Sequence, residues 1–404
     1  MIILFINYRM ISQFIDTKDI KDIAYTLLLL FMRFHIPGIP HTVANQDYLT
    51  CAFTQKLIKF CKMFAESEHT VIFYGHEDSK VLCTEFVPIV NSEFLEKYYG
   101  KFDPDKLIPY GNQELESEFN NLCIQEISKR KEDRDFILCF WGNGQKQITD
   151  KFPECIAVEP GIGYPANGTF AQYKVFESYA HMHYVYGVTG IKEEKWYDAV
   201  IPNYFDLSDF EYNSDKADYI LYIGRVIKCK GIDICIQLAK KTGTKLLIAG
   251  QGKLENLGYT DLPGNVVHVG SANLDERKKL LSNAKCVIAP SYYLEPFGRV
   301  VIEALLSGTP VITTDWGAFP EINIHGVTGY RCHTFEQFEW ALKNIGDIKP
   351  EACRKWATEN FSLNRVKEMY EEYFHMVSNL YTGKGFYEEN PSRTELNWLK
   401  KNYV

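Results

Sequence analysis

The sequence predicts an α/β protein in which two doubly wound domains, each a parallel sheet covered by helices, follow one another along the chain. Its length of 404 residues is too great for one ordinary domain of about 150 residues. Apolar residues make up 46% and charged residues 24% of the chain, as in globular proteins. From Arg33 onward, short β-rich runs alternate with helical patterns, which is typical of βαβ units.

The first domain is expected over residues 32–201. Buried strands are predicted at residues 33–36, 71–74, 136–140 and 155–158. The apolar side chains of residues 51–64 recur near helical spacing, so this segment is predicted to be a helix. A charged helical run at residues 114–135 would fill a long crossover.

The second domain is expected over residues 217–360, where the alternation is clearer. Strands are predicted at residues 219–223, 245–249, 266–269, 286–289 and 311–314, and helices at residues 232–241, 275–282 and 296–307. The acidic segment 202–216 has little apolar periodicity and is predicted to be the linker. After Gly346 the pattern becomes helical again, with an apolar stripe.

Residues 1–31 are predicted to be an N-terminal extension with two apolar clusters. Neither cluster is long enough to cross a bilayer, which takes ~20 apolar residues. A signal peptide fits poorly, because the start lacks a basic region and no small-residue cleavage site follows. We expect a helix packed on the first domain, with a loosely held extension and a membrane-surface anchor as alternatives.

The overall charge argues against nucleic-acid binding, and the cysteines argue against a zinc ribbon and a disulfide framework. Acidic side chains outnumber basic ones, 52 to 44, for a net charge of −8. Binding to nucleic-acid phosphates needs a basic surface, so no nucleic-acid partner is expected. The 11 cysteines include no C-x-x-C pair, so we expect neither a zinc ribbon nor a disulfide framework, but reduced and mostly buried thiols in a cytoplasmic protein.

The segment after the predicted strand 286–289 indicates an anion site. Its turn opens a helix at Pro296, which would occupy the first helical position. The free amides of Phe297, Gly298 and Arg299 would then point outward from a helix N-terminus, where anions bind. Gly298 would let a phosphate approach the backbone closely.

Two carboxylates, Glu295 and Glu303, lie eight residues apart around this helix. Along a helix that rises 1.5 Å per residue they would be about 12 Å apart. A nucleotide sugar has about that reach between its sugar and its ribose, so one carboxylate would accept hydrogen bonds from the sugar and the other from the ribose. Taken alone, the pair would also fit a solvated helix whose dipole favours an N-terminal acid.

Glycines and cations follow other strands of the second domain at the same sheet edge. Gly224, Arg225 and Lys230 occupy the turn after its first strand, and the two cations would neutralise a diphosphate without a metal. Gly250 and Gly252 form a tight turn after the next strand. These glycines do not complete the dinucleotide-binding pattern, since the third glycine is missing.

Over about residues 202–361 the chain resembles the GT-B glycosyltransferases of family 4 (glycosyl transferases group 1). The matching segments are YILYIGRVIKCKG, KLLIAGQGK, APSYYLEPFGRVVIEALLSGTPVITTDWGAFPEI and HGVTGY. The resemblance implies two Rossmann-like domains that face a cleft, with C-terminal helices in residues 361–404 that cross back to the first domain. It also implies sugar transfer with retention of the anomeric configuration.

The resemblance further implies roles for the predicted site residues. Arg225 and Lys230 would hold the donor diphosphate. Glu295 would face the donor sugar and Glu303 the ribose, while the amides of residues 297–299 would cap the phosphates and the sugar.

The acceptor side matches this family only in outline. Gly38 and His41 lie where such enzymes have a flexible glycine-containing loop near the acceptor, and this chain has a single glycine there with two prolines. The histidine that such enzymes commonly have after a middle strand has no clear counterpart. The segment here offers Trp141, Asn143 and Gln145, so an amide or a water would take over its contact.

Two further clusters keep alternatives open. Glu159, Gly161 and Gly163 follow a predicted strand and would either line the cleft or form a structural turn. His181 and His183 are two residues apart, which on a strand would place them on one face as metal ligands. Because no third ligand lies nearby, we expect partly exposed histidines of a sheet.

The sequence therefore predicts a retaining, metal-independent, hexosyltransferase-type glycosyltransferase (EC 2.4). It would move a sugar from a UDP- or GDP-sugar to a hydroxyl of a glycan or other acceptor, with no cofactor. The alternatives are a nucleotide-sugar epimerase of the same fold and a catalytically impaired protein that binds sugar nucleotides. The donor base, the acceptor and the oligomeric state stay open.

Overall fold

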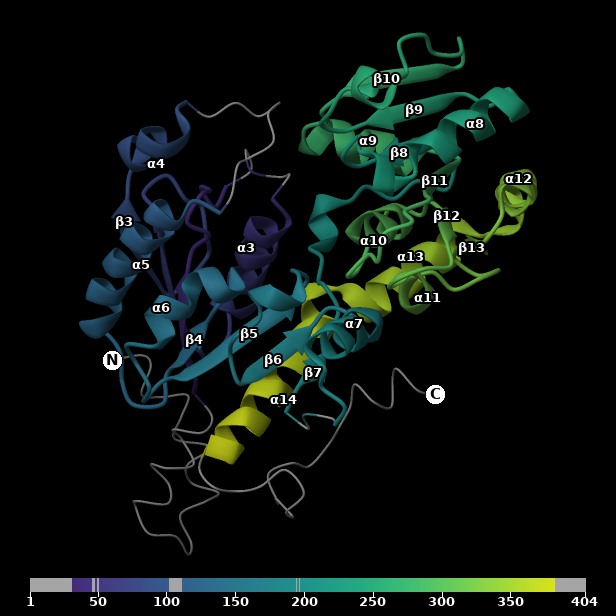
Figure 1. Cartoon of the computed structure of the whole chain (residues 1–404). Coiled ribbons are helices and arrows are strands. Elements are labelled where there is room, and N and C mark those ends of the chain that lie inside the picture. The colour runs from purple at the N-terminus through teal and green to yellow at the C-terminus, as the bar shows by residue number, and fades with distance from the viewer. Residues whose placement is uncertain are drawn as a thin grey trace, which may run out of the picture.

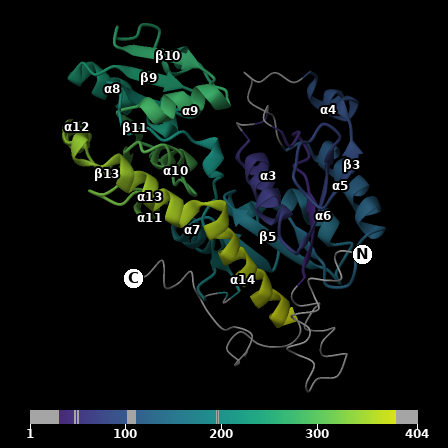
Figure 2. The ribbon, with the colours of Figure 1, turned by 180° about the vertical axis from the view of Figure 1, so that it is seen from behind.

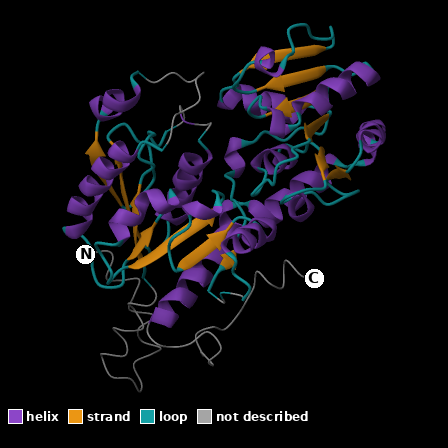
Figure 3. Ribbon diagram, viewed as in Figure 1, coloured by secondary structure: helices purple, strands orange, loops and turns teal. Residues whose placement is uncertain are grey.

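The computed structural model describes residues 31–45, 48, 51–101, 111–193, 195 and 197–381. Over these residues the chain forms two parallel β-sheets with helices packed around them (Figure 1 and Figure 3). Apart from Phe31, the predicted N-terminal extension lies outside the described residues. The same holds for residues 382–404 of the predicted C-terminal segment.

The first sheet has seven parallel strands in the order β3-β2-β1-β4-β5-β6-β7. These strands are β1 (Arg33–Pro37), β2 (Thr70–His76), β3 (Glu85–Val90), β4 (Phe136–Leu138), β5 (Ile156–Ile162), β6 (Tyr173–Phe176) and β7 (Ala199–Val200). The helices are α3 (Ala52–Ala65), α4 (Ser92–Tyr99), α5 (Gln113–Ser128), α6 (Lys146–Thr149) and α7 (Tyr179–Thr189). The four predicted strands and the helix predicted at residues 51–64 are all present.

The sequence pattern does not predict β3, β6 and β7. β3 is an edge strand whose apolar run is interrupted by Pro88 and which begins with two exposed residues. β6 and β7 have four and two residues, too few for a periodic signal. The helix predicted at residues 114–135 ends at Ser128, because the charged residues that follow turn through Arg134, at φ 73°, into β4.

The second sheet has six parallel strands in the order β10-β9-β8-β11-β12-β13. These strands are β8 (Ile220–Ile223), β9 (Leu246–Ala249), β10 (Val266–Gly270), β11 (Cys286–Ala289), β12 (Val311–Thr314) and β13 (Gly329–Cys332). The helices are α8 (Ile232–Thr242), α9 (Leu274–Asn283), α10 (Arg299–Leu306), α11 (Phe319–Ile322), α12 (Phe335–Lys343) and α13 (Pro350–Phe361). The five predicted strands are present, and two doubly wound sheets confirm the predicted fold class.

The start predicted for α10 is wrong. The helix begins at Arg299, so Pro296 is not its first residue. Phe297 is only 1% exposed and packs against the ring of Phe205, with 6.3 Å between the centroids. The chain turns inward to bury Phe297 before the helix begins, and Gly298, at φ 88°, makes that turn.

The two domains are joined where two segments of the chain cross. In the predicted linker, Tyr204 is buried in the hydrophobic core of the first domain. The next residue, Phe205, is buried in the hydrophobic core of the second domain. The amide of Phe205 donates to the carbonyl of Phe361 at 2.9 Å, and the amide of Leu363 donates to the carbonyl of Phe205 at 3.1 Å. The start of the predicted linker is therefore packed between the domains.

The helix α14 (Leu363–Tyr381) returns to the first domain, as the family resemblance implies (Figure 2). Its aromatic residues enter the core of that domain. The ring of Phe374 lies 4.8 Å from that of Phe34, and the ring of Tyr370 lies 5.3 Å from that of Phe60, measured between centroids. The C-terminal helices thus tie the second domain to the first.

The strand predicted around His181 and His183 is wrong, because this segment is the helix α7. Ser178 caps the helix by accepting a hydrogen bond from the amide of His181 at 3.1 Å. On a helix, residues two apart do not share a face. His181 is buried, with Nε2 3.0 Å from the carbonyl oxygen of Tyr164, whereas His183 is exposed. Within the described ranges, no group of three or more His, Cys, Asp or Glu side chains is placed to hold a metal.

The cysteines agree with the expectation of buried thiols. All 11 are free, and eight of them are buried. In the part of the chain that the structure describes, none of the helices combines the length and the apolar character that crossing a membrane requires.

Candidate functional site

Two predicted donor residues meet where the strand order of the second sheet reverses. β8 and β11 are neighbours, and the strands that follow each of them lie on opposite sides of this pair. Ligands of doubly wound sheets bind in the crevice at such a switch point. The loop after β8 carries Lys230, in the 3-10 turn η5 (Lys228–Lys230), and the loop after β11 carries Glu295. Parallel topology thus joins residues 65 positions apart.

The carboxylate of Glu295 is 5% exposed and has three side-chain partners. Nζ of Lys230 lies 2.5 Å from Oε1, the hydroxyl of Ser291 donates to Oε1 at 2.7 Å, and the hydroxyl of Tyr293 donates to Oε2 at 2.6 Å. Burial and the charge of Glu295 raise the pKa of Tyr293, so this hydroxyl keeps its proton and donates. The network holds both charged groups in place before any ligand arrives.

Ser291 and Tyr293 are site residues that the sequence reasoning missed. Both precede Glu295 by four residues or fewer. The hydroxyl-rich turn SYYLE was the available signal, because a buried carboxylate needs hydrogen-bond donors close by. Tyr293 also contacts Lys230 directly, with Nζ 3.1 Å from its hydroxyl and 4.8 Å from its ring centroid.

The glycines after β8 and β9 bring two loops into backbone contact. Gly250 has φ 148°, and a Cβ placed on it would lie 1.9 Å from the carbonyl oxygen of Gly224. Gly252 has φ 113° and lies against the backbone of Val226, where an added Cβ would be 3.0 Å from the carbonyl oxygen. Only glycine fits so close an approach of two main chains. Their role in binding a donor stays a prediction.

The start of α10 presents unused backbone donors. Gly298 is the N-cap of this eight-residue helix, and no side chain caps it. Within the described residues, the amides of Phe297, Gly298 and Arg299 donate to no protein acceptor. Such amides favour an anion at a helix N-terminus. The start of α10 thus keeps amides that face no protein acceptor although the helix begins later than predicted, and the anion site stays a prediction.

Arg225, the second predicted diphosphate ligand, is exposed. Its backbone is held, because its carbonyl oxygen accepts from the hydroxyl of Tyr222 at 2.6 Å. Its side chain has no ion pair with any described residue, in contrast to Lys230. Lys230 is thus held in place by a carboxylate and Arg225 is not, and the role of both in binding a diphosphate stays a prediction.

Glu303 lies in a second part of the cleft, away from the network of Glu295. Because Glu295 precedes the helix, the helical estimate of their separation does not apply. Nη2 of Arg277 lies 2.5 Å from one carboxylate oxygen of Glu303, and Nε of Arg299 lies 3.8 Å from the other. These residues and Lys59 of α3 line a cavity of about 300 Å³ between the domains. Arg277 is 26 residues before Glu303, and no sequence signal links the two.

Arg299 has an unused donor at this cavity. Its Nη1 atom is buried and has no hydrogen-bond partner among the described residues. Buried donors are normally satisfied, so this group is suited to bind an oxygen of a ligand. The guanidinium carbon of Arg299 lies 4.9 Å from the ring centroid of Phe205, which orients it.

We predict that part of the free energy of unfolding is lost in acid because the Glu303 carboxylate becomes protonated. Burial acts to raise its pKa, but the nearby Arg277 and Arg299 more than offset this, so the folded-state pKa lies below the ordinary value of 4.5. The stabilisation is therefore present above the unfolded-state pKa and lost as pH falls through the lower folded-state value. At pH 7, Glu303→Gln should reduce the free energy of unfolding by roughly 1–3 kcal/mol.

Thermal unfolding at pH 7 and in steps below pH 4.5 tests this expectation. The difference in melting temperature between wild type and Glu303→Gln should narrow as the pH falls. Glu255→Gln, at an exposed position, serves as the matched control. A difference that stays constant with pH would show that the charge of Glu303 is not what stabilises the fold.

The predicted acceptor residues lie at the switch point of the first sheet, between β1 and β4. Nε2 of Gln145 donates to the carbonyl oxygens of Gly38 at 2.9 Å and Pro37 at 3.1 Å. His41 is 5% exposed and packs on Trp141, with 4.6 Å between ring centroids. Burial lowers the pKa of His41 to about 4, so it is neutral at pH 7. The two segments that the sequence singled out separately thus form one closed loop cluster.

Gln145 and Trp141 are already engaged in this cluster. The Gln145 amide holds the loop after β1, and Nε1 of Trp141 donates to Glu116 at 2.9 Å. Asn143 is exposed. Of the residues considered in place of the family histidine, Asn143 is therefore the one whose side chain is open to solvent.

Glu159 has a structural role, although it and Gly161 lie within β5 rather than in the predicted turn. It is fully buried and accepts hydrogen bonds from the hydroxyl of Tyr164 at 2.6 Å and the amides of Phe170 and Ala171 at 3.0 and 2.8 Å. A carboxylate engaged in three bonds braces the turn after β5. It is not free to line the cleft.

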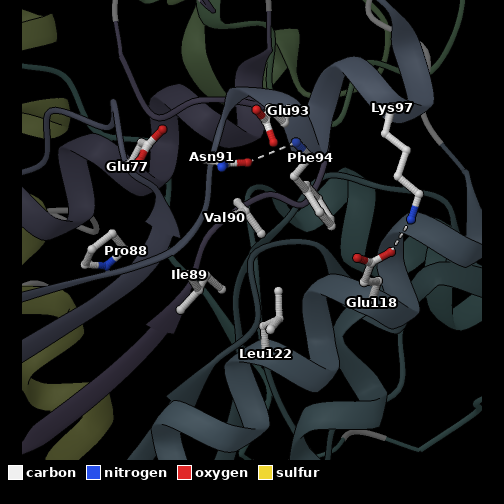
Figure 4. A pocket seen from close by; sticks show the side chains of 10 residues that line it. All are labelled: Glu77, Pro88, Ile89, Val90, Asn91, Glu93, Phe94, Lys97, Glu118 and Leu122. Atoms are coloured by element: carbon white, nitrogen blue, oxygen red, sulfur yellow. Dashed lines mark hydrogen bonds and ion pairs between the residues drawn. The ribbon is translucent and has the colours of Figure 1, made fainter.

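A larger cavity, of about 650 Å³, lies on the first domain between β3, α4 and α5 (Figure 4). An ion pair of 2.8 Å between Lys97 and Glu118 closes one side, and Asn91 caps α4 by accepting from the amide of Phe94 at 3.1 Å. All of its lining residues belong to the first domain, and none is a predicted site residue. We therefore place the candidate site at the cleft between the domains.

Comparison with known proteins finds relatives of the second domain and of the whole fold. Residues 205–360 match the sequence model of the family described as glycosyl transferases group 1. The second domain thus matches this family over its whole length, while the match covers 156 of the 404 residues of the chain. The chain is 33% identical over 171 residues to an uncharacterized glycosyltransferase of Methanocaldococcus jannaschii, a match that covers 39% of this chain and 42% of that relative. The chain thus spans half or less of the length of the curated relatives it matches, from 30% to 50%.

Two solved structures share the arrangement of both domains. AviGT4, a glycosyltransferase involved in avilamycin A biosynthesis, superposes with a TM-score of 0.62 at 19% identity, covering 86% of this chain and 98% of that chain. HepE of Anabaena, solved with UDP and glucose, superposes with a TM-score of 0.59 at 14% identity, covering 84% and 98%. The chain therefore has the GT-B fold, and its match to the group 1 family lies in the second domain.

Proposed function

We propose that this protein is a retaining, metal-independent glycosyltransferase that moves a hexosyl group from a UDP- or GDP-sugar to a hydroxyl of a glycan or other acceptor. The observation that carries the proposal is the buried Glu295 carboxylate, paired with Lys230 at 2.5 Å in the crevice of the group 1 domain. A carboxylate held in this way accepts hydrogen bonds from sugar hydroxyls. The adjacent cation and the helix amides of α10 suit the attached diphosphate.

The proposed chemistry follows from where charge develops. As the bond from the sugar to the diphosphate breaks, negative charge builds on the departing phosphate oxygen. Lys230, the exposed Arg225 and the amides of residues 297–299 would stabilise that charge. Donors preorganised around developing charge are usually the largest single contribution to catalysis. In this proposal no divalent ion is required.

The second part of the donor site would hold the nucleoside. Glu303 would accept hydrogen bonds from the ribose diol, in exchange for part of its contact with Arg277, 2.5 Å away. The comparison with HepE, solved with UDP and glucose, supports a nucleotide-sugar donor. It does not select between uracil and guanine.

Thermal unfolding with a panel of nucleoside diphosphates tests the donor assignment. A ligand at 100 times its Kd adds about 2.7 kcal/mol of stability, which for a domain of this size raises Tm by roughly 5–10 °C. We expect this shift with UDP or GDP, and we expect it to persist in EDTA. A protein carrying both Arg225→Ala and Lys230→Ala should show no shift.

Incubation of the matching sugar nucleotide separates the alternatives. Transfer to an acceptor panel, unaffected by EDTA and with the anomeric configuration kept, is the expected result. Isomerised donor formed without an acceptor would indicate an epimerase. Binding without turnover on any acceptor would indicate a catalytically impaired protein, and loss of transfer in EDTA would contradict metal independence.

A further inference from the structure

The N-terminus of α7, in the first domain, is capped by a residue of the second domain. The two carboxylate oxygens of Glu321, in α11, accept hydrogen bonds from the amides of Tyr179 at 2.9 Å and Ala180 at 2.8 Å. A helix start has free amides and a partial positive charge, so an anion there is favoured. Here the two partners lie 142 and 141 positions apart and belong to different domains.

A second contact between the domains starts from the same helix end. The hydroxyl of Ser178 accepts from the amide of His181 at 3.1 Å and donates to the carbonyl oxygen of Pro296 at 2.6 Å. Ser178 is 1% exposed, so its hydroxyl has no water to replace these partners. Pro296 directly follows Glu295 and directly precedes the free amides of residues 297–299.

Both contacts lead back to Glu295. The amide of Ala318, which precedes α11, donates to the carbonyl oxygen of Glu295 at 3.1 Å. Next to it, Gly317 is so close that an added Cβ would lie 2.7 Å from the amide nitrogen of Glu295. The helix start of α7 therefore holds the main chain at Glu295 from two sides, through Ser178 on one and through Glu321 on the other.

We propose that Ser178 and Glu321 are positioning residues, which use the capped N-terminus of α7 to hold Glu295 and the amides of α10 in register with the first domain. This inference rests on the proposed function, because it assigns Glu295 to the donor sugar and the first domain to the acceptor. The two residues touch no substrate. They set the distance between the donor and the acceptor attached to opposite domains.

The decisive variants are Glu321→Gln and Ser178→Ala. Glutamine has nearly the same shape, but its NH2 group cannot accept, so one of the two amides of α7 loses its acceptor. We expect kcat for sugar transfer to fall about 10–100-fold in each variant. A shift of about 1 Å between reacting groups lowers the rate by about that factor. The Kd for UDP or GDP should change less than about 3-fold, because Arg225, Lys230 and the α10 amides are untouched.

Hydrogen exchange supplies a readout that does not depend on activity. Amide exchange of Tyr179 and Ala180 should speed up in Glu321→Gln, while the second half of α7 stays protected. Ser178→Thr keeps the hydroxyl and should retain most of the transfer activity. Glu336→Gln is the matched control, since Glu336 is an exposed carboxylate in the first turn of α12, within the second domain.

The outcomes separate this inference from the proposed function. Transfer within 2-fold of wild type in both variants would overturn the inference, as would parallel losses of kcat and nucleotide affinity, which indicate general damage. Unchanged exchange at Tyr179 and Ala180 in Glu321→Gln would overturn it as well. If the wild type binds no nucleoside diphosphate, the proposed function fails, and the exchange experiment still tests whether Glu321 holds α7.

Discussion

Lys230→Ala is expected to reduce the rate of sugar transfer by about 10²–10³-fold while the protein stays folded. Nζ of Lys230 lies 2.5 Å from the Glu295 carboxylate. Removing one preorganised group that stabilises the charge of the transition state lowers kcat by about 10²–10³-fold. Glu295 keeps its hydrogen bonds from Ser291 and Tyr293, so its carboxylate is not left without donors. Steady-state kinetics and thermal unfolding of the same preparation measure both effects.

Arg225→Ala should also lower transfer strongly, with less effect on stability than Lys230→Ala, because Arg225 is exposed. Lys228→Ala is the matched control for both variants. Lys228 is an exposed cation of the same turn and has no ion pair among the described residues. The assignment of the diphosphate site fails if Lys230→Ala and Arg225→Ala turn over donor as well as Lys228→Ala does.

Gly250→Ala is expected to give a large loss of stability from a single methyl group. The added Cβ would lie 1.9 Å from the carbonyl oxygen of Gly224, and φ at this residue is 148°. Neither main chain can give way without breaking bonds at the ends of β8 and β9, such as that from the amide of Gly224 to the carbonyl of Ala249 at 2.9 Å. We expect a loss of about 3 kcal/mol or more in the free energy of unfolding, or roughly 6–12 °C in Tm.

Substitutions at two other glycines distinguish the effect of the close contact with Gly224 from the effect of a positive φ. Gly258 has φ 88° with no atom within 4 Å of an added Cβ, and Gly264 has open space and no positive φ. Gly258→Ala should therefore cost about 1 kcal/mol, and Gly264→Ala should leave Tm unchanged. Equal losses in Gly250→Ala and Gly258→Ala would show that the contact with Gly224 is not the cause.

The core strands and the long helices could be predicted because their signals are local. Strands such as β8 and β11 are runs of buried apolar residues, and α3 repeats its apolar residues near helical spacing. β3 lies at an edge and contains Pro88, so that signal is broken. The segment of His181 was predicted to be a strand, because the hydropathy pattern does not reveal that Ser178 caps the helix α7.

The site was predictable in part for the same reason. Lys230 and Glu295 each follow a recognisable strand, and parallel strands of one sheet end at a common edge. The start of α10 was misplaced, since helix chemistry favours Pro296 at the first position whereas the burial of Phe297 delays the helix to Arg299. Tertiary packing outweighed local preference at this point.

The sequence by itself determined the two parallel sheets, the glycine turns at their edges and the candidate residues Lys230 and Glu295. These features depend on the spacing of residues close together in the chain. Only the tertiary structure decided that Arg277 pairs with Glu303 and that Glu321 caps α7, because the partners are 26 and about 140 positions apart. No local pattern encodes such a contact, since it exists only after the two domains have packed.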